Sequence, residues 1–407
     1  MPYLNNRLNI LLVLPFFYPH RGGAQKYAEE LYAKLLKKYR GLRVDVLCYN
    51  SDDAPYYEEY RGMRIYRVPC YTFLPGRFLL PKPFALFRVL KLLANNNYDY
   101  VNTHSRFFDP TWWLWIYAKY LGAKSIFTGH VASHPIHENK VVQIISYIVD
   151  STLARFSLKF YDFHTFTNIE ALRFFRDKLG VHRPKYLIYG GVDTDFFYPA
   201  SKHDRVIPKI NRAVADESIL VTFVGRITWT KGITYLLDSI NQLYKRYPKS
   251  KLRFVIAGPG DLEDYCKNFV KNKNLEKRLI LTGNLSYTQV RDLLSISDVF
   301  INPSHHSEGF PNTILEAGAS GCFIIATDNA GTKEVVVNNK TGFLVPQKTP
   351  EAYIKSLIWA EKHPAQRKII SNNMRKLIVA KHSWSTISKI FYNLLHSGRI
   401  DKKLIYR

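Results

Sequence analysis

Short apolar runs alternate with helix-patterned segments along this chain of 407 residues. In the first half, the apolar runs 9–14 and 44–48 flank the segment 24–39, in which Tyr27 and Leu31 lie on one helical face. Strands that are separated by helices pair in parallel, and the helices cover both faces of the sheet. The alternation therefore predicts a doubly wound α/β fold.

The same alternation restarts in the second half of the chain. Apolar runs recur at 219–224, 253–257, 279–282, 299–302 and 322–326. A domain usually has roughly 100–200 residues, so the length suits two Rossmann-like domains. The polar, proline-bearing segment 198–208 is the expected linker. We expect domains at 1–200 and 201–385, followed by a basic helix or tail at 386–407. Two such domains would bind a ligand in a cleft at the carboxyl ends of their strands.

The net charge of +25 implies an anionic partner, such as nucleic acid, an anionic membrane or a phosphorylated ligand. Seven bases and no acid lie between Arg61 and Tyr98, and eleven bases but one acid follow from Lys362 to the end. No nucleic-acid-binding module is recognisable. The four cysteines include no C-x-x-C pair, which indicates a reducing compartment. No apolar run reaches the roughly 18 residues that span a bilayer, so we expect a cytoplasmic protein.

The segment 223–232 carries two cations at the end of a predicted strand. Gly225 allows a tight turn there, and Arg226 and Lys231 follow it. A pyrophosphate requires charge-assisted donors, and the guanidinium fork matches phosphate oxygens. Two solvated surface cations are an equally good interpretation of this segment alone. The glycines of 256–261 are a weaker signal, because a plain turn also explains them.

The segment 303–318 follows another strand and places two carboxylates near a predicted helix start. Pro311 is tolerated in a first helical turn, Glu308 precedes it, and Glu316 lies one turn inside the helix. Carboxylates beside a phosphate site accept hydrogen bonds from sugar or ribose hydroxyls. The alternative is two ordinary surface glutamates. Gly331 and Thr332, at a further helix start, form a candidate second phosphate cradle.

Three motifs in the C-terminal half carry a family resemblance: Gly-Arg-(x4)-Lys-Gly, Glu-Gly-Phe-Pro-(x4)-Glu-Ala and Thr-Gly-Phe-Leu-Val. In order and spacing they resemble retaining glycosyltransferase family 4, which has the GT-B fold of two Rossmann-like domains facing across a cleft. The resemblance implies transfer of a sugar from a nucleotide-diphosphate sugar with retention at the anomeric carbon, without a metal or other cofactor. It also implies that the final helix crosses back towards the first domain.

The resemblance assigns roles to single residues. Arg226 and Lys231 would bind the donor's pyrophosphate, and Glu316 the ribose hydroxyls. Glu308 would lie near the transferred sugar as a catalytic residue. The backbone amides of the donor loop would come from Gly309, Phe310 and Pro311.

In the N-terminal half, Gly22 and Gly23 follow the first strand. The resemblance implies a loop there against the donor phosphates and the acceptor, while a simple turn is the alternative. His130 ends a predicted strand and would contact the sugar, with His104 one unit earlier as the second candidate. Gly190 stands where the family's interdomain segment usually has Asn, so no contact is assigned to that position.

The kind of acceptor is predicted from the composition of segments expected on the protein surface. The segment 71–93 mixes aromatic and aliphatic residues with four cations, a composition typical of segments at an anionic bilayer surface. Trp112, Trp113 and Trp115 are better explained as core. We therefore expect a peripheral enzyme on the inner face of the membrane, with a lipid-linked saccharide as acceptor in polysaccharide or glycoconjugate synthesis. The alternatives are another GT-B enzyme, such as a sugar-nucleotide epimerase, or a non-enzymatic binder of nucleic acid or anionic surfaces.

Overall fold

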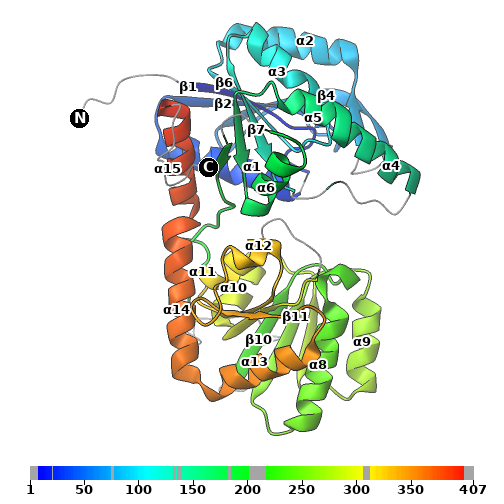
Figure 1. Cartoon of the computed structure of the whole chain (residues 1–407), viewed down its shortest axis with the longest axis vertical. Coiled ribbons are helices and arrows are strands. Elements are labelled where there is room, and N and C mark those ends of the chain that lie inside the picture. The colour runs from blue at the N-terminus through cyan, green and yellow to red at the C-terminus, as the bar shows by residue number, and fades with distance from the viewer. Residues whose placement is uncertain are drawn as a thin grey trace, which may run out of the picture. The chain divides into compact units, whose positions relative to one another are not determined.

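The structure is a computed structural model that describes residues 8–20, 22–74, 78–131, 134, 140–181, 185–200, 217–305 and 312–397. The described residues up to Gly190, together with those from Ile387 on, form unit 1, and Gly191–Thr386 form unit 2. Each unit contains a mainly or wholly parallel sheet with helices around it (Figure 1). This confirms the predicted α/β class with two Rossmann-like units.

Unit 1 holds a nine-stranded sheet in the part of the chain that the structure describes, in the order β3-β4-β2-β1-β6-β7-β8-β9 with β5 beside β4. All neighbours pair in parallel except β3 and β5, which run antiparallel to β4. The hairpin strands β3 and β5 had no counterpart in the sequence prediction. The strands are β1 (Leu8–Val13), β2 (Leu42–Asn50), β3 (Tyr57–Tyr60), β4 (Met63–Leu74), β5 (Phe78–Pro81), β6 (Tyr100–His104), β7 (Lys124–Gly129), β8 (Phe163–Phe166) and β9 (Lys185–Leu187).

Helices bury both faces of this sheet. Leu11 and Val13 pack in one core cluster with residues of α2 and α3, while the alternate residues Ile10 and Leu12 are fully buried on the opposite face. The helices are α1 (Gly23–Lys38), α2 (Pro83–Leu93), α3 (Pro110–Tyr120), α4 (Lys140–Val149), α5 (Arg155–Leu158) and α6 (Ile169–Asp177), with a 3-10 turn η1 (Ala94–Asn96) and a π-helical turn η2 (Asp150–Ala154).

Unit 2 holds a parallel sheet in the order β12-β11-β10-β13-β14-β15. The elements are β10 (Ile219–Val224), η3 (Trp229–Lys231), α8 (Ile233–Arg246), β11 (Leu252–Ala257), α9 (Glu263–Asn272), β12 (Leu279–Gly283), α10 (Tyr287–Ile296), β13 (Val299–Asn302), α11 (Asn312–Ala319), β14 (Phe323–Thr327), α12 (Ala330–Lys333), β15 (Phe343–Val345), α13 (Pro350–Lys362) and α14 (Pro364–Lys381). The last helix, α15 (Trp384–Ser397), begins in unit 2 and belongs to unit 1 from Ile387 on. The strands predicted from 219 to 326 are therefore confirmed within a residue or two.

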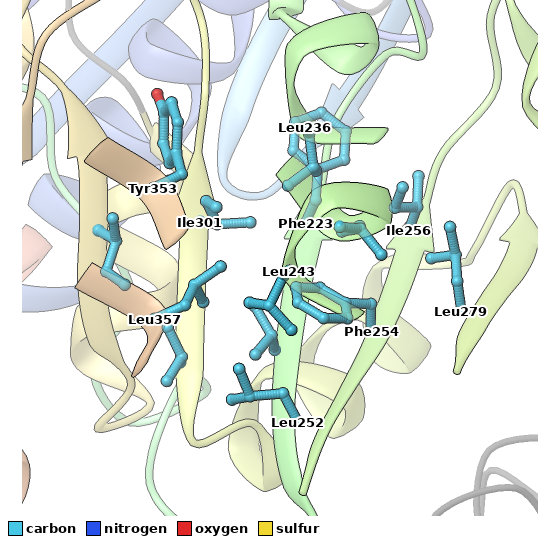
Figure 2. Close-up of a cluster of buried hydrophobic side chains, with 14 of the residues drawn as sticks. Phe223, Leu236, Leu243, Leu252, Phe254, Ile256, Leu279, Ile301, Tyr353 and Leu357 are labelled. Atoms are coloured by element: carbon cyan, nitrogen blue, oxygen red, sulfur yellow. The ribbon is translucent and has the colours of Figure 1, made fainter. Parts of the chain in front are cut away.

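The largest core cluster of unit 2 lies between its sheet and the helices α8 and α13. Figure 2 shows Phe223, Phe254 and Ile301 of the strands meeting Leu236 and Leu243 of α8. These side chains are buried almost completely, and each contributes about 1.5–3 kcal/mol through removal from water. This packing fixes the positions of the strands. The residues predicted to bind the donor follow the carboxyl ends of these strands.

The divisions between the units fall after Gly190 and after Thr386, inside α15. Val192 and Phe197 precede the expected linker, yet they pack in a core cluster of unit 2, so the first division precedes residue 200. Gly191 lies against the indole of Trp384, where a Cβ would come within 2.6 Å of the ring. No helix among the described residues is both long and apolar enough to cross a bilayer.

Candidate functional site

Two glycine-bearing loops at the carboxyl edge of the unit 2 sheet pack backbone against backbone. The amide of Gly225 donates to Ala257 O over 3.0 Å, and the amide of Ile227 donates to Pro259 O over 2.8 Å. A Cβ on Gly258 would overlap the carbonyl oxygen of Gly225, and one on Gly260 would overlap that of Ile227. These glycines are therefore required by close packing of the loops, which a plain turn does not need.

The packed loops place two cations at this edge. Arg226 is exposed and Lys231 half-buried, in the turn between β10 and α8. Gly232 has a left-handed backbone with φ of 73°, and a Cβ there would overlap the carbonyl group of Pro303. The turn that carries Lys231 is thereby held against the end of β13. A guanidinium and an ammonium carried by one turn at the end of parallel strands can bind a diphosphate.

The same turn is linked to the chain segment that follows β13. The amide of His305 and the hydroxyl of Ser304 both donate to Thr230 O, over 3.3 and 3.4 Å. The His305 ring lies edge-on to Trp229, with centroids 4.5 Å apart. The sequence did not predict this aromatic contact, because a contact between two different loops leaves no pattern along the chain.

The residues predicted next along the chain divide into two groups. Glu308, Gly309, Phe310 and Pro311 lie outside the described residues, so their roles remain predictions. Glu316 lies in α11 and is buried at 6% exposure. It is therefore not an ordinary surface glutamate, because a buried carboxylate is costly unless it is paired.

Gly331 and Thr332 lie in α12, which spans only Ala330–Lys333. The Thr332 hydroxyl donates to Asn329 Oδ1 over 2.7 Å and is buried. Asn329 Nδ2 in turn donates to Ser304 O over 3.0 Å. Asn329 therefore joins the loops after β13 and β14, and Thr332 holds the side chain of Asn329 in place. A direct contact of Thr332 with phosphate remains a prediction.

In unit 1, Gly22 precedes α1 as its N-cap residue, and Gly23 is the first helical residue. A Cβ on Gly22 would meet the flexible side chain of Gln25, whereas one on Gly23 would meet nothing within 4 Å. Packing within the described chain therefore does not require glycine at position 23. Arg67 of β4 contacts the loop before this helix, because its Nη2 donates a hydrogen bond to Tyr18 O over 2.6 Å.

His104 and His130 meet at the carboxyl edge of the unit 1 sheet. His104 ends β6, where it pairs with Thr128 of β7, and His130 follows β7 directly. His104 Nδ1 and His130 Nε2 are 3.0 Å apart. Burial lowers the pKa of His130 to about 4, and burial together with the neighbouring ring holds the pKa of His104 well below its usual value. Both rings are therefore neutral near pH 7.

A buried ion pair beside this edge escaped sequence reasoning. Arg106 forms an ion pair with Asp150 of η2, and both side chains are at most 2% exposed. His134, predicted to be only a loop histidine, contacts Asp150 Oδ2 through Nδ1 over 2.7 Å. Asp150 is the only acid between Lys140 and Tyr161, and a single acid within an apolar helical segment is the signal that could have revealed the pair. Among the described residues, no cluster of His, Cys, Asp or Glu is arranged to hold a metal ion.

The segment 71–93, predicted as the acceptor surface, contains both exposed and buried side chains. Phe84 and Phe87 of α2 are 90% and 69% exposed. Leu79 is buried, and Leu86 packs against the core cluster that also includes Trp113. The tryptophans of α3 are half-buried, and Trp113 and Trp115 pack against core clusters of unit 1.

Comparison with known proteins identifies this pair of units. The sequence model described as Glycosyltransferase Family 4 matches residues 21–196, and the one described as Glycosyl transferases group 1 matches residues 207–377. A sucrose-phosphate synthase from Thermosynechococcus elongatus has the same fold, with a TM-score of 0.75 at 19% identity over 97% of this chain and 100% of that chain. Anabaena Alr3699/HepE in complex with UDP reaches 0.74 at 17% identity over 96% and 100%.

Curated relatives span nearly the whole chain. An uncharacterised glycosyltransferase of Methanocaldococcus jannaschii is 24% identical over 95% of this chain and 99% of its own. One subunit of the phosphatidylinositol N-acetylglucosaminyltransferase of Arabidopsis thaliana is 25% identical over 94% and 80%. A UDP-Gal:alpha-D-GlcNAc-diphosphoundecaprenol alpha-1,3-galactosyltransferase of Escherichia coli is 27% identical over 83% and 84%.

The two doubly wound units define a GT-B enzyme, and the matching family models make it a glycosyltransferase. The chain belongs to glycosyltransferase family 4. The family resemblance predicted from three short motifs is thereby confirmed. The findings favour transfer over the alternatives of an epimerase or a non-enzymatic nucleic-acid binder.

Proposed function

We propose that this glycosyltransferase moves a hexose-type sugar from a nucleotide-diphosphate sugar to a lipid-linked saccharide, with retention and without a metal. The observation that carries the donor half is the close packing of Gly225 against Gly258, because Arg226 follows Gly225 directly at the carboxyl edge of the unit 2 sheet and Lys231 lies in the same turn. The two cations bind the diphosphate and stabilise the charge that grows on the leaving group. Glu316 binds the ribose hydroxyls. The UDP complex of Anabaena Alr3699/HepE supports a nucleotide donor.

The donor site is tested by ligand-dependent stability. Unfolding is followed in EDTA with UDP, GDP, ADP and their sugars for the wild type, Glu316→Gln and Arg226→Ala. A nucleotide at about a hundred times its dissociation constant adds roughly 2.7 kcal/mol to the wild type, and both variants lose most of this gain. Arg246→Ala is the matched control, because Arg246 is an exposed arginine at the far end of α8. If DNA or RNA stabilises the wild type and no nucleotide does, the proposal is wrong.

At the sugar, His130 and Glu308 are the proposed catalytic residues. Attack on the same face as the departing phosphate would give retention, with that phosphate accepting the acceptor's proton. The anomeric configuration of the product, determined by NMR of the new glycosidic bond, tests this step. An inverted product contradicts the proposed mechanism.

The lipid-linked acceptor is supported by the relatives, whose names include a phosphatidylinositol and a diphosphoundecaprenol substrate. It is also supported by the exposed face of α2, formed by Phe84, Phe87, Arg88, Lys91 and Leu92. Exposed aromatic rings that alternate with cations suit the interface of an anionic bilayer. We therefore propose that the enzyme acts as a peripheral protein on the inner face of the membrane.

A second apolar surface lies on α4, which Figure 1 shows at the margin of unit 1. Ile144, Ile145 and Ile148 are all more than half exposed. Lys140 begins this helix, and Arg155 follows it on α5, so cations flank the apolar residues. An apolar helix face flanked by cations suits a position in the plane of the bilayer interface.

Vesicle binding tests the membrane contact. The double variant Phe84→Ser/Phe87→Ser loses about 1.5–3 kcal/mol for each ring that enters the bilayer, so sedimentation with anionic vesicles falls by tenfold or more. Lys271→Ala, which removes an exposed cation of α9, is the control and leaves binding unchanged. Equal sedimentation of the wild type and the double variant would contradict the role of α2.

A further inference from the structure

The two histidines at the carboxyl edge of the unit 1 sheet are hydrogen-bonded to each other. His104 is 1% exposed, and its Nδ1 lies 3.0 Å from His130 Nε2. The ring of Tyr27 lies edge-on to His130 with centroids 5.1 Å apart, and its hydroxyl donates to Ile188 O over 3.1 Å. Asn168 Nδ2 donates to the carbonyl oxygen of His130 over 3.2 Å. The backbone and one side of the His130 ring are thus held in place.

A hydrogen bond between the two facing nitrogens uses one proton, which either His104 Nδ1 or His130 Nε2 carries. The nitrogen that carries it determines the tautomer of both rings. His104 Nε2 is buried and has no hydrogen-bond partner among the described residues. If His130 donated, His104 would carry its proton on that buried nitrogen as an orphaned N–H. If His104 donates through Nδ1–H, only a lone pair is left there. Orphaned buried N–H groups are rarer than under-satisfied acceptors, so the second arrangement is favoured.

We propose that His104 is a positioning residue, which donates through Nδ1–H to His130 Nε2 and so fixes the proton of His130 on Nδ1. This rests on the proposed function, in which His130 contacts the transferred sugar. His130 then offers a hydrogen-bond donor at Nδ1 to a sugar hydroxyl. Neither histidine has a charged partner among the described residues, so this hydrogen bond is the interaction that selects the tautomer.

The tautomer can be measured directly. Protein labelled with 15N-histidine gives two-bond N–H correlations that separate Nδ1–H from Nε2–H rings, and the His130→Asn spectrum identifies the signals of His130 among the 13 histidines. We expect Nδ1–H on His130 in the wild type. An Nε2–H ring at His130 in the wild type overturns the inference, even if no variant folds.

Two substitutions of His104 separate positioning from simple packing. The side-chain amide of His104→Gln can still donate to His130 Nε2, whereas His104→Leu fills the space without a donor. We expect Gln to retain the tautomer and Leu to lose it, with kcat at least about tenfold lower for Leu, since a wrong histidine tautomer is costly in catalysis. KM for the donor changes less than kcat. Equal loss in both variants, or an unchanged tautomer in Leu, overturns the inference.

The histidine tautomers and the transfer of sugar are measured separately, so either proposal can fail without the other. If the tautomers are as expected but no nucleotide sugar stabilises the protein or is consumed, the histidine pairing stands and the donor proposal falls. If sugar transfer occurs and His130 carries its proton on Nε2, the transferase function stands and the positioning role of His104 falls.

Discussion

The α-carbon of Gly258 lies against the carbonyl oxygen of Gly225, so a methyl group at position 258 would overlap that oxygen. Gly258 also has φ of 139°, which L-residues rarely adopt. We expect Gly258→Ala to lower the free energy of unfolding by about 2–6 kcal/mol, from about 1–3 kcal/mol of overpacking and about 1–3 kcal/mol of backbone strain. Urea denaturation measures this loss.

Gly283 provides the matched control. Its φ is 70°, but a Cβ there would meet nothing within 4 Å. Gly283→Ala should therefore cost only the backbone strain of about 1–2 kcal/mol. If the two variants are equally stable, close packing of the two loops does not explain the glycine at position 258.

The ion pair of Arg106 and Asp150 is buried on both sides. Burial lowers the pKa of Arg106, and Asp150 opposes this shift. Asp150→Asn would leave a buried guanidinium without its counter-ion, so we expect a loss of about 3–5 kcal/mol in the free energy of unfolding. Adding Arg106→Met should restore part of the loss. The exposed pair of Arg176 and Asp177 is the control, where Asp177→Asn leaves the free energy of unfolding nearly unchanged because water screens both charges.

The histidine pair makes stability depend on pH. Burial lowers the pKa of His130 from 6.5 to about 4. Between these values the unfolded chain binds more protons than the folded one, so the free energy of unfolding falls as the pH drops from 6.5 to 4, by up to about 3 kcal/mol. The shift at His104 has the same direction. Above pH 6.5 the contribution is constant.

The pH effect is measured as a difference, because carboxylates also titrate in acid. Urea midpoints at pH 7 and pH 4.5 are compared for the wild type and for His104→Asn/His130→Asn. We expect the double variant to lose less stability on acidification than the wild type. An equal or larger loss in the variant would show that the two histidines are not buried in the neutral form.

The last helix contributes to the core of unit 1. Phe391 of α15 is buried edge-on to Tyr32 of α1, with centroids 5.8 Å apart, and Tyr100 donates to Leu395 O over 2.6 Å. Phe391→Ala should cost about 3–5 kcal/mol and increase hydrogen exchange in β1 and β6. Lys389→Ala, on the exposed face of the same helix, should change neither. Unchanged exchange in β1 would exclude α15 as a part of this core.

Much of the fold followed from sequence periodicity. The runs 219–224 and 299–302 were predicted as strands and are β10 and β13 without change. Periodicity reports local burial, and strands covered on both faces are continuous apolar runs. The antiparallel strands β3, β4 and β5 were missed, because β3 and β5 have only four residues each and β4 carries arginine and tyrosine among its apolar residues.

The candidate site was predictable where it depends on residue type at fixed spacing. Arg226 and Lys231 follow β10 as expected, and the packing of Gly258 explains a glycine that alone indicated only a turn. The role of Trp229 beside His305 was not predictable, since aromatic contacts between different loops leave no periodic signal.

The sequence by itself determined the two doubly wound sheets and the family, because hydrophobic spacing and short motifs are properties of neighbouring residues. Only the tertiary structure decided that His104 bonds to His130, 26 residues away, and that Arg106 is buried against Asp150. Hydrogen bonds and ion pairs require atoms within about 3 Å. That separation is set by how strands and helices pack together, and no local pattern along the chain specifies it.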